Sequence, residues 1–271
     1  MSGDRSPPAS PNRRASDGGK TARVEENGGE STDTESAVQT TLTGEVAETD
    51  EVIVSAHVGE NAAVFPKVLA LHVEEGARIA DLTCGNLVFW DRVPPGRYDL
   101  TATDLDASKS RDSVEGVDCR DTPHAEDSFD AVVLDPPYAA GFFRDRAENR
   151  PGTGTHDSFR SAYSSGVAPK GSGKYHRAVL DLYGAAGREA RRILRDGGTF
   201  IVKVQDEVCA NTQELTHIQI TDDYEEMGFE TIDLFVVVRA NRPSVSGMEK
   251  QVHARKNHSY FMVYRHCADD N

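Results

Sequence analysis

The sequence contains no long apolar run. No stretch approaches the roughly 20 residues that span a bilayer, although 37% of the 271 residues are hydrophobic. This composition excludes a protein built on membrane-spanning helices and also a wholly disordered chain, and it favours one domain with an additional tail. The opening residues, MSGDRSPPASPNRR, lack the apolar core of a secretory signal, so we expect a soluble, cytoplasmic protein.

Closely spaced cysteines are also missing. The chain has 4 cysteines, far apart and without a C-x-x-C pair, which argues against both a structural zinc site and a disulfide framework. His57 and His258 likewise have no partner at a metal-binding spacing. We therefore expect no metal and four reduced thiols, namely Cys84, Cys119, Cys209 and Cys267.

Positive charge is scarce, because 30 basic residues face 45 acidic ones and the net charge is -15. Such a balance counts against a nucleic-acid partner, since phosphate binding needs local positive charge. Residues 239–265 are the exception, with Glu249 as their only acid. This segment is either a basic approach surface for nucleic acid or a solvated loop before an edge strand. Its basic residues are Arg239, Arg242, Lys250, Arg255, Lys256 and Arg265.

The composition changes near residue 50. Residues 1–50 contain one leucine and no aromatic residue, so they cannot bury enough apolar surface to fold, and we predict a disordered acidic tail. The predicted folded domain spans residues 51–267. Within it, residues 139–175 are too long and too rich in Gly and Ser for a structural connection, and we predict a flexible insertion there.

The folded part alternates short β-rich runs with helical stretches, which predicts an α/β three-layer domain with a mostly parallel sheet. We expect the helix over residues 176–194 to be capped by Asp196-Gly197-Gly198. The expected strands are residues 78–82, 98–103, 130–134, 199–204, 231–238 and 259–264, and the other expected helices are residues 66–73 and 213–227.

The most informative motif is Asp135-Pro136-Pro137-Tyr138, which follows an apolar strand. Because proline has no N–H, the Asp135 carboxylate and the Pro136 carbonyl present only acceptors at the carboxyl end of the sheet, where α/β proteins bind ligands. Acceptors suit a planar amino group, whose two N–H bonds are held while Tyr138 stacks on the attached base. The plainer alternative is a strand followed by a Pro-Pro turn with an anchoring tyrosine.

A second motif lies upstream, where the strand ending in Asp81 opens into a turn containing Thr83 and Gly85. Glycine lets the backbone approach a ligand closely, and the carboxylate can hold an ammonium or a hydroxyl. Asp104 ends the next strand, where an acid takes ribose hydroxyls in such folds, although an ordinary strand-end acid is an equal alternative. Asp118, next to Cys119, is placed either near the adenine of a nucleotide cofactor or in a solvated turn.

The order of these residues resembles the amino-group DNA methyltransferases, which use S-adenosyl-L-methionine (SAM) and have the class I Rossmann-like fold. The likeness covers about residues 52–265. It includes residues 55–59 and 65–67 before the glycine turn, and residues 256–261 resemble the last strand of such enzymes. One position departs from the pattern, because Leu87 stands where the family usually has a second glycine.

The resemblance implies a three-layer sandwich whose sheet is mostly parallel with an antiparallel last strand. It implies SAM as cofactor, DNA as partner and transfer of a methyl group to an exocyclic amine, with adenine N6 favoured over cytosine N4. It also implies a base flipped out of the duplex. The implied catalytic residues are Asp135, Pro136, Pro137 and Tyr138, and the implied cofactor-binding residues are Asp81, Thr83, Gly85, Asp104, Asp118 and Cys119.

Two alternatives stay open. One is an RNA enzyme that methylates base amino groups in transfer or ribosomal RNA, and the other is a catalytically silent module that binds the cofactor. We expect Phe89 and Trp90 to cover the sheet rather than touch substrate. A last group follows a strand at the ligand-binding edge and is expected only to support the site: Lys203, Gln205, Asp206 and Glu207.

Overall fold

The structure is a computed structural model that describes residues 38–40, 46–48, 52–111, 116–139, 176–240 and 250–268. All of these residues belong to one unit, Ala37–Asn271. The predicted insertion lies outside the described residues except for Ala139. The predicted tail contributes one antiparallel pair of short strands, β1 (Val38–Thr40) and β2 (Val46–Glu48). The limits of the folded domain therefore stay a prediction.

The core of the unit is a seven-stranded sheet in the order β3-β10-β11-β7-β6-β4-β5. Every strand is parallel to the others except β11, which runs antiparallel to both of its neighbours, β10 and β7. This arrangement confirms the predicted class I methyltransferase fold, a mostly parallel sheet with an antiparallel last strand. The strands are β3 (Ala56–Val58), β4 (Arg78–Asp81), β5 (Asp99–Ala102), β6 (Phe129–Leu134), β7 (Leu194–Val204), β10 (Phe229–Val238) and β11 (His258–His266).

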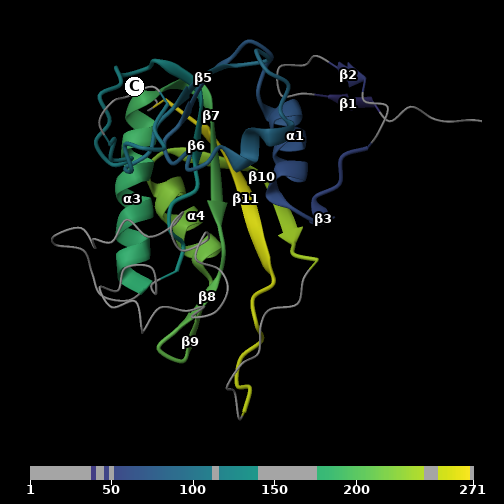
Figure 1. Cartoon of the computed structure of the whole chain (residues 1–271), viewed down its shortest axis with the longest axis vertical. Coiled ribbons are helices and arrows are strands. Elements are labelled where there is room, and N and C mark those ends of the chain that lie inside the picture. Colours follow the sequence, from purple (N-terminus) through teal and green to yellow (C-terminus); the bar gives the residue numbers. More distant parts are fainter. Residues whose placement is uncertain are drawn as a thin grey trace, which may run out of the picture. The chain divides into compact units, whose positions relative to one another are not determined.

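Helices cover both faces of the sheet (Figure 1). The helix α1 (Asn61–His72) lies on one face, and α3 (His176–Ile193) and α4 (Thr216–Glu226) lie on the other. Because side chains alternate along a strand, Val133 of β6 faces the α1 layer and Val132 faces the α3 and α4 layer. Within the described residues, none of the helices has the length and apolarity that crossing a membrane requires.

Each expected strand is present, with ends that differ from the expected ones by up to five residues. Three expectations about the helices also differ from the structure. The first helix begins at Asn61 instead of residue 66, so Pro66 lies inside it; burial of Phe65 and Leu69 against the sheet offsets the hydrogen bond that the proline lacks. The expected cap after α3 is wrong, because β7 begins at Leu194 directly after the helix and includes residues 196–198. The third expected helix begins at Thr216 rather than residue 213.

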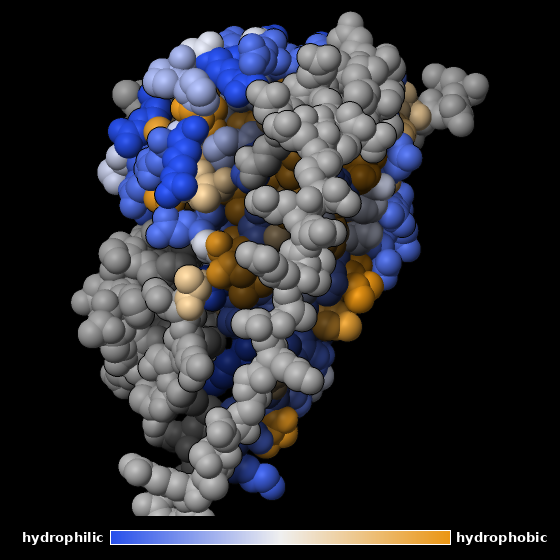
Figure 2. Space-filling view, turned by 90° about the vertical axis from the view of Figure 1, so that its right-hand side faces the viewer, coloured by the Kyte–Doolittle hydropathy of each residue, from blue (hydrophilic) through white to orange (hydrophobic). Residues whose placement is uncertain are grey.

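Several short elements were not expected. A hairpin of β8 (Glu207–Cys209) and β9 (Thr212–Glu214) follows β7, and its two turn residues have positive φ. The alternative that placed an edge strand after residues 239–257 is also wrong, since β11 is interior and the edge strands of the sheet are β3 and β5. Figure 2 shows the side of the molecule that carries α1 and β3, where hydrophobic patches interrupt a hydrophilic surface. Exposed valines in and around β3 are Val52, Val54 and Val58.

Glycine at position 187 is required by the contact between α3 and α4. A Cβ there would lie 2.4 Å from Cε1 of Tyr224, whose ring is fully buried and whose hydroxyl donates to the Tyr183 carbonyl. We expect Gly187→Ala to lower the free energy of unfolding by about 1–3 kcal/mol, because the ring must move in a close-packed core. Urea denaturation followed by circular dichroism measures this change.

Gly184→Ala is the matched control on the same helix. A Cβ at position 184 meets its nearest atoms at 3.8 and 3.9 Å, which is ordinary contact. This variant should therefore stabilise the protein by about 0.5–1 kcal/mol through the better helix propensity of alanine. Equal effects of the two substitutions would contradict the proposed packing constraint.

Candidate active site

The carboxyl ends of β4, β5, β6 and β7 lie at one edge of the sheet, as parallel strands require. Four of the expected site residues are joined there, in two pairs, by hydrogen bonds between different loops. The Gly85 N–H donates to Asp104 Oδ2 at 3.0 Å, and the Asp135 N–H donates to Thr83 Oγ1 at 2.6 Å. The expected glycine turn, ribose acid and Pro-Pro motif are therefore one connected group.

Asp81 is a buried carboxylate at the base of this group. Asp81 is only 3% exposed. Its carboxylate accepts hydrogen bonds from Trp90 Nε1 at 2.8 Å and from the Thr83 N–H at 3.1 Å. Burial raises the pKa of Asp81 to about 6 against the opposing effect of these two donors, and the nearby Asp104 raises it further. The Asp81 side chain is thus mostly ionised at neutral pH and takes up a proton as the pH falls through about 6.

Trp90 packs against the core beside the sheet, as expected, and also has a contact that the sequence analysis did not predict. Its ring does pack edge-on against Phe65, with the ring centroids 5.1 Å apart, but its indole N–H also holds Asp81. It lies in the short 3-10 helix η1 (Val88–Arg92), which directly follows the glycine turn. Nothing in the local pattern pairs a tryptophan with an acid nine positions earlier, so this contact was not predictable.

Removing the indole donor should raise the pKa of Asp81 above about 6. We expect this result for Trp90→Phe because the hydrogen bond stabilises the charged form of the buried carboxyl. Carbon-13 NMR titration of the Asp81 carboxyl measures the change. Phe89→Leu is the control, since it alters the packing around Phe65 but removes no donor to Asp81; an equal shift in both variants would count against the hydrogen bond as the cause.

The turn between β4 and η1 is left-handed at position 87, where the sequence departs from the family pattern. Leu87 has φ 60°, in the left-handed region that glycine favours, and Gly85 has φ 49°. The Leu87 N–H donates to the Cys84 carbonyl at 2.8 Å and closes the turn. The chain therefore accepts a strained leucine where glycine would adopt the same conformation without strain.

The segment from Asp135 to Pro137 has no backbone donor left to offer. The two prolines have no N–H, and the Asp135 N–H is used by Thr83. Asp135 and Pro137 are half-buried and Pro136 is buried. The backbone of residues 135–137 thus offers carbonyl acceptors only, and binding of an amino group by this segment stays a prediction.

The Tyr138 ring is buried in the core, whereas the sequence analysis expected it to stack on a base. It is 7% exposed and belongs to the core on the α3 side of the sheet, and its hydroxyl accepts a hydrogen bond from Arg239 Nη2 at 3.2 Å. Burial raises its pKa to about 12. Stacking by Tyr138 stays a prediction and requires the ring to leave this position.

Asp118 and Cys119 are held beside β5, because the Val117 N–H donates to the Asp104 carbonyl at 2.9 Å. The Asp118 carboxylate forms an ion pair with Arg120, and Arg120 lowers the pKa of that carboxyl. Burial raises the pKa of the Cys119 thiol to about 12, so the thiol is not reactive. Contact of these residues with an adenine stays a prediction.

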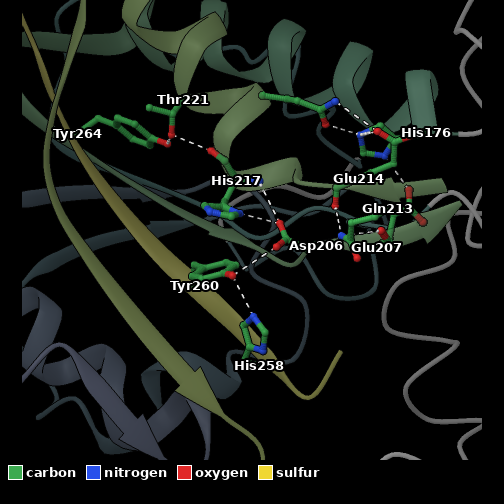
Figure 3. Close-up of polar contacts among 11 residues, drawn as sticks. His176, Asp206, Glu207, Gln213, Glu214, His217, Thr221, His258, Tyr260 and Tyr264 are labelled. Atoms are coloured by element: carbon green, nitrogen blue, oxygen red, sulfur yellow. Dashed lines mark hydrogen bonds and ion pairs between the residues drawn. The ribbon is translucent and has the colours of Figure 1, made fainter. Parts of the chain in front are cut away.

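A polar network that the sequence analysis did not connect surrounds Asp206, beyond the end of β7 (Figure 3). Asp206 follows β7 and accepts hydrogen bonds from His217 at 2.7 Å and from the Tyr260 hydroxyl at 3.3 Å. The Tyr260 hydroxyl in turn contacts Nε2 of His258 at 2.9 Å, and the His217 and Tyr260 rings stack with centroids 4.3 Å apart. Asp206 was expected only as a supporting residue, and its partners come from α4 and β11.

A second histidine ties the start of α3 to the β8–β9 hairpin. Nδ1 of His176 lies 2.8 Å from Glu207, and Nε2 lies 2.7 Å from Gln219. Burial alone would lower the pKa of His176, but the hydrogen bonds to Glu207 and Gln219 outweigh it and raise the pKa. Among the described residues, no three His, Cys, Asp or Glu side chains gather in a way that could hold a metal ion.

The expected basic surface is divided by the structure. Arg265 pairs with Thr199 near the far end of β11, so it does not share an edge with Arg239, which follows β10 and whose N–H donates to the Asn257 carbonyl at 2.8 Å. Arg242 lies outside the described residues. The described basic residues that remain between β10 and β11 are Arg239, Lys250, Arg255 and Lys256.

Comparison with known proteins gives likeness in structure only. No protein family and no curated protein matches the sequence. A Thermus thermophilus protein, provisionally assigned as a DNA modification methylase and solved in complex with SAM, is 18% identical, with 57% of this chain and 55% of that chain covered and a TM-score of 0.35. The match therefore spans about half of that protein's length.

Two further structures resemble this chain over a longer part of it. A provisionally assigned methyltransferase from Bacillus halodurans C-125 is 12% identical, with 76% of this chain and 100% of that chain covered and a TM-score of 0.47. TrmN from Thermus thermophilus is 16% identical, with 76% of this chain and 48% of that chain covered and a TM-score of 0.41.

Proposed function

We propose that the protein is a SAM-dependent methyltransferase that methylates the exocyclic amino group of a DNA base, with adenine N6 favoured over cytosine N4. The observation that carries this proposal is the acceptor-only edge from Asp135 to Pro137, whose last backbone donor is bound by Thr83. An edge of this kind selects a group that donates two hydrogen bonds. An aromatic amino group meets that requirement.

The residues around Asp81 fit SAM by the chemistry of their side chains. Asp81 is a carboxylate suited to an ammonium group, and Asp104 offers carboxylate oxygens to vicinal hydroxyls. Gly85 has a positive φ, and the nearest atom to a Cβ built there is 4.0 Å away, so the backbone is open to close approach by a ligand. When bound, SAM supplies a methyl group made electrophilic by its sulfonium.

The acceptor edge acts by positioning. The Asp135 carboxylate and the Pro136 carbonyl accept the two N–H bonds of the amine, which directs the nitrogen lone pair away from the edge. As positive charge develops on the nitrogen, the negative charge of Asp135 stabilises it. Asp135 thus needs to be ionised and fixed in direction, but it does not need to remove a proton first.

A duplex base must leave the stack before its amino group can reach this edge. Arg239, Arg255 and Lys256 follow β10 or precede β11 at the same edge and supply local positive charge for a phosphate backbone. Within a chain of net charge -15, binding would be local and sensitive to salt. DNA is therefore the partner we propose.

Transfer of tritium from methyl-labelled SAM to DNA, RNA and protein in parallel tests the proposal. We expect label in DNA, and mass spectrometry of its nucleosides should find N6-methyladenine. Label only in RNA would overturn the DNA assignment and leave the reaction type intact. If the protein binds SAM but labels no substrate, the proposed methyltransferase activity is overturned. The alternative of a catalytically silent module that binds the cofactor is then favoured.

A further inference from the structure

Lys203 is a buried cation in an apolar part of the sheet. It is 2% exposed, and its Nζ donates to Ser259 Oγ at 2.8 Å and lies 4.1 Å from the centre of the Phe261 ring. Two residues earlier on the same strand, Ile201 belongs to the apolar core on the α1 side. An apolar side chain at position 203 would continue the apolar packing of Ile201 without the free-energy cost of removing a charged amine from water. Stability therefore does not explain the lysine.

The register of the sheet places Lys203 beside Asp135. Leu134 of β6 pairs with Val202 of β7, so the next residues along these parallel strands, Asp135 and Lys203, are also neighbours. Their side chains continue the alternation of Val133 and Ile201, both of which lie in the core on the α1 side. Lys203 and Asp135 therefore share one face at the carboxyl edge of the sheet.

The charged groups that act on Lys203 come from two other elements. Burial lowers the pKa of Lys203 to about 7, Asp135 directly after β6 raises it, and Arg239 after β10 lowers it. Ser259 and Phe261 on β11 are uncharged. Among the described residues, the negative group that favours the ammonium is thus the carboxylate at the centre of the acceptor edge.

We propose that Lys203, held by Ser259, is a positioning residue that fixes the Asp135 carboxylate in its ionised form and orients it toward the amino group of the substrate. This inference rests on the proposed function, because it assigns Asp135 the part described above. The Lys203 side chain does not touch the substrate. It acts through the charge and direction of Asp135.

The test replaces the amine with an apolar side chain of similar length, Lys203→Met. We expect the kcat of methyl transfer to fall about 10- to 100-fold, as for a displaced reactive group, while the Kd for SAM stays within about three-fold. Wild-type kcat should fall as the pH rises through about 7, because the ammonium is lost, and this limb should be missing in the variant. The pKa of the Asp135 carboxyl, followed by carbon-13 NMR without SAM or DNA, should rise in the variant.

Stability separates this role from a structural one. A lysine whose pKa falls from 10.5 to about 7 on folding opposes folding below pH 7, and stability rises between pH 7 and 10.5. Lys203→Met should therefore have a higher Tm than wild type at pH 6, with the gain shrinking toward pH 10. A loss of Tm together with kcat would show a structural residue and overturn the proposal.

Arg195→Met is the matched control, because Arg195 of β7 pairs with Asp130 of β6 at 2.7 Å near the opposite end of the same two strands. It should leave kcat and the pH limb unchanged. Ser259→Ala removes only the hydrogen bond to Lys203 and should lower kcat by a few-fold. Unchanged kcat and an unchanged Asp135 pKa in Lys203→Met would overturn the inference alone, whereas a wild-type protein that methylates no nucleic acid would overturn the proposed function.

Discussion

Asp135→Ala should lower methyl transfer about 1000-fold or more while the Kd for SAM stays within a few-fold. The substitution removes one of the two acceptors proposed to hold the amine and the negative charge proposed to stabilise the developing cation. Loss of one such stabilising group costs about 10²–10³-fold in kcat, and here both contributions are lost together. The turn proposed to face the cofactor contacts position 135 through the backbone N–H of residue 135, which donates to Thr83 Oγ1 and is kept in alanine. Single-turnover kinetics and calorimetric titration with SAM measure the two quantities.

Asp130→Ala is the control for a lost carboxylate on the same strand. Asp130 lies near the opposite end of β6, where it accepts a hydrogen bond from the Arg78 N–H and pairs with Arg195. We expect its loss to reduce stability and to leave the kcat of the folded protein unchanged. If Asp135→Ala abolished SAM binding instead, the assigned roles of the two motifs would be reversed.

The second large effect concerns Asp81. Asp81→Ala should weaken SAM binding about 100-fold, because it removes the carboxylate proposed for the ammonium and leaves the Trp90 and Thr83 donors without their acceptor. In the wild type, SAM affinity should fall as the pH drops through about 6, where Asp81 takes up a proton. Asp81→Asn should bind weakly with a flat profile across this range, and an unaltered pH dependence in that variant would contradict the assignment.

Protonation of Asp81 should weaken SAM binding but should favour folding. Its pKa rises from 3.8 to about 6 on folding, so the folded state binds more protons than the unfolded state between these values. The carboxyl therefore opposes folding by up to about 3 kcal/mol above pH 6, and this cost is absent below pH 3.8. Asp81→Asn should raise the free energy of unfolding at pH 8 and lose that advantage at pH 4, as measured by urea denaturation.

Much of the site edge was predictable from the sequence because its residues follow local sequence patterns. Apolar runs that end in an acid predicted β4, β5 and β6 with Asp81, Asp104 and Asp135 at their carboxyl ends. Parallel strands bring such residues to one edge, and the hydrogen bonds of Gly85 and Thr83 join them.

The other half of the edge depends on contacts between distant parts of the chain. Lys203 is buried because β11 pairs with β7 and places Phe261 and Ser259 against it, and Asp206 meets His217 and Tyr260 only after α4 and β11 have docked. Such pairings depend on strand register, which hydrophobic periodicity alone does not give. The misplaced helix ends have a similar cause, since packing outweighed the signals of Pro66 and of residues 196–198.

The interior place of β11 also governs how a growing chain can fold. Until residues 258–266 leave the ribosome, β7 and β10 have no strand between them, and the half-sheets β5-β4-β6-β7 and β10-β3 remain separate with unsatisfied edges. The nascent polypeptide therefore passes through a stage in which two long strands can pair with other chains. Chaperone capture during synthesis should be strongest in the interval between completion of β10 and emergence of β11.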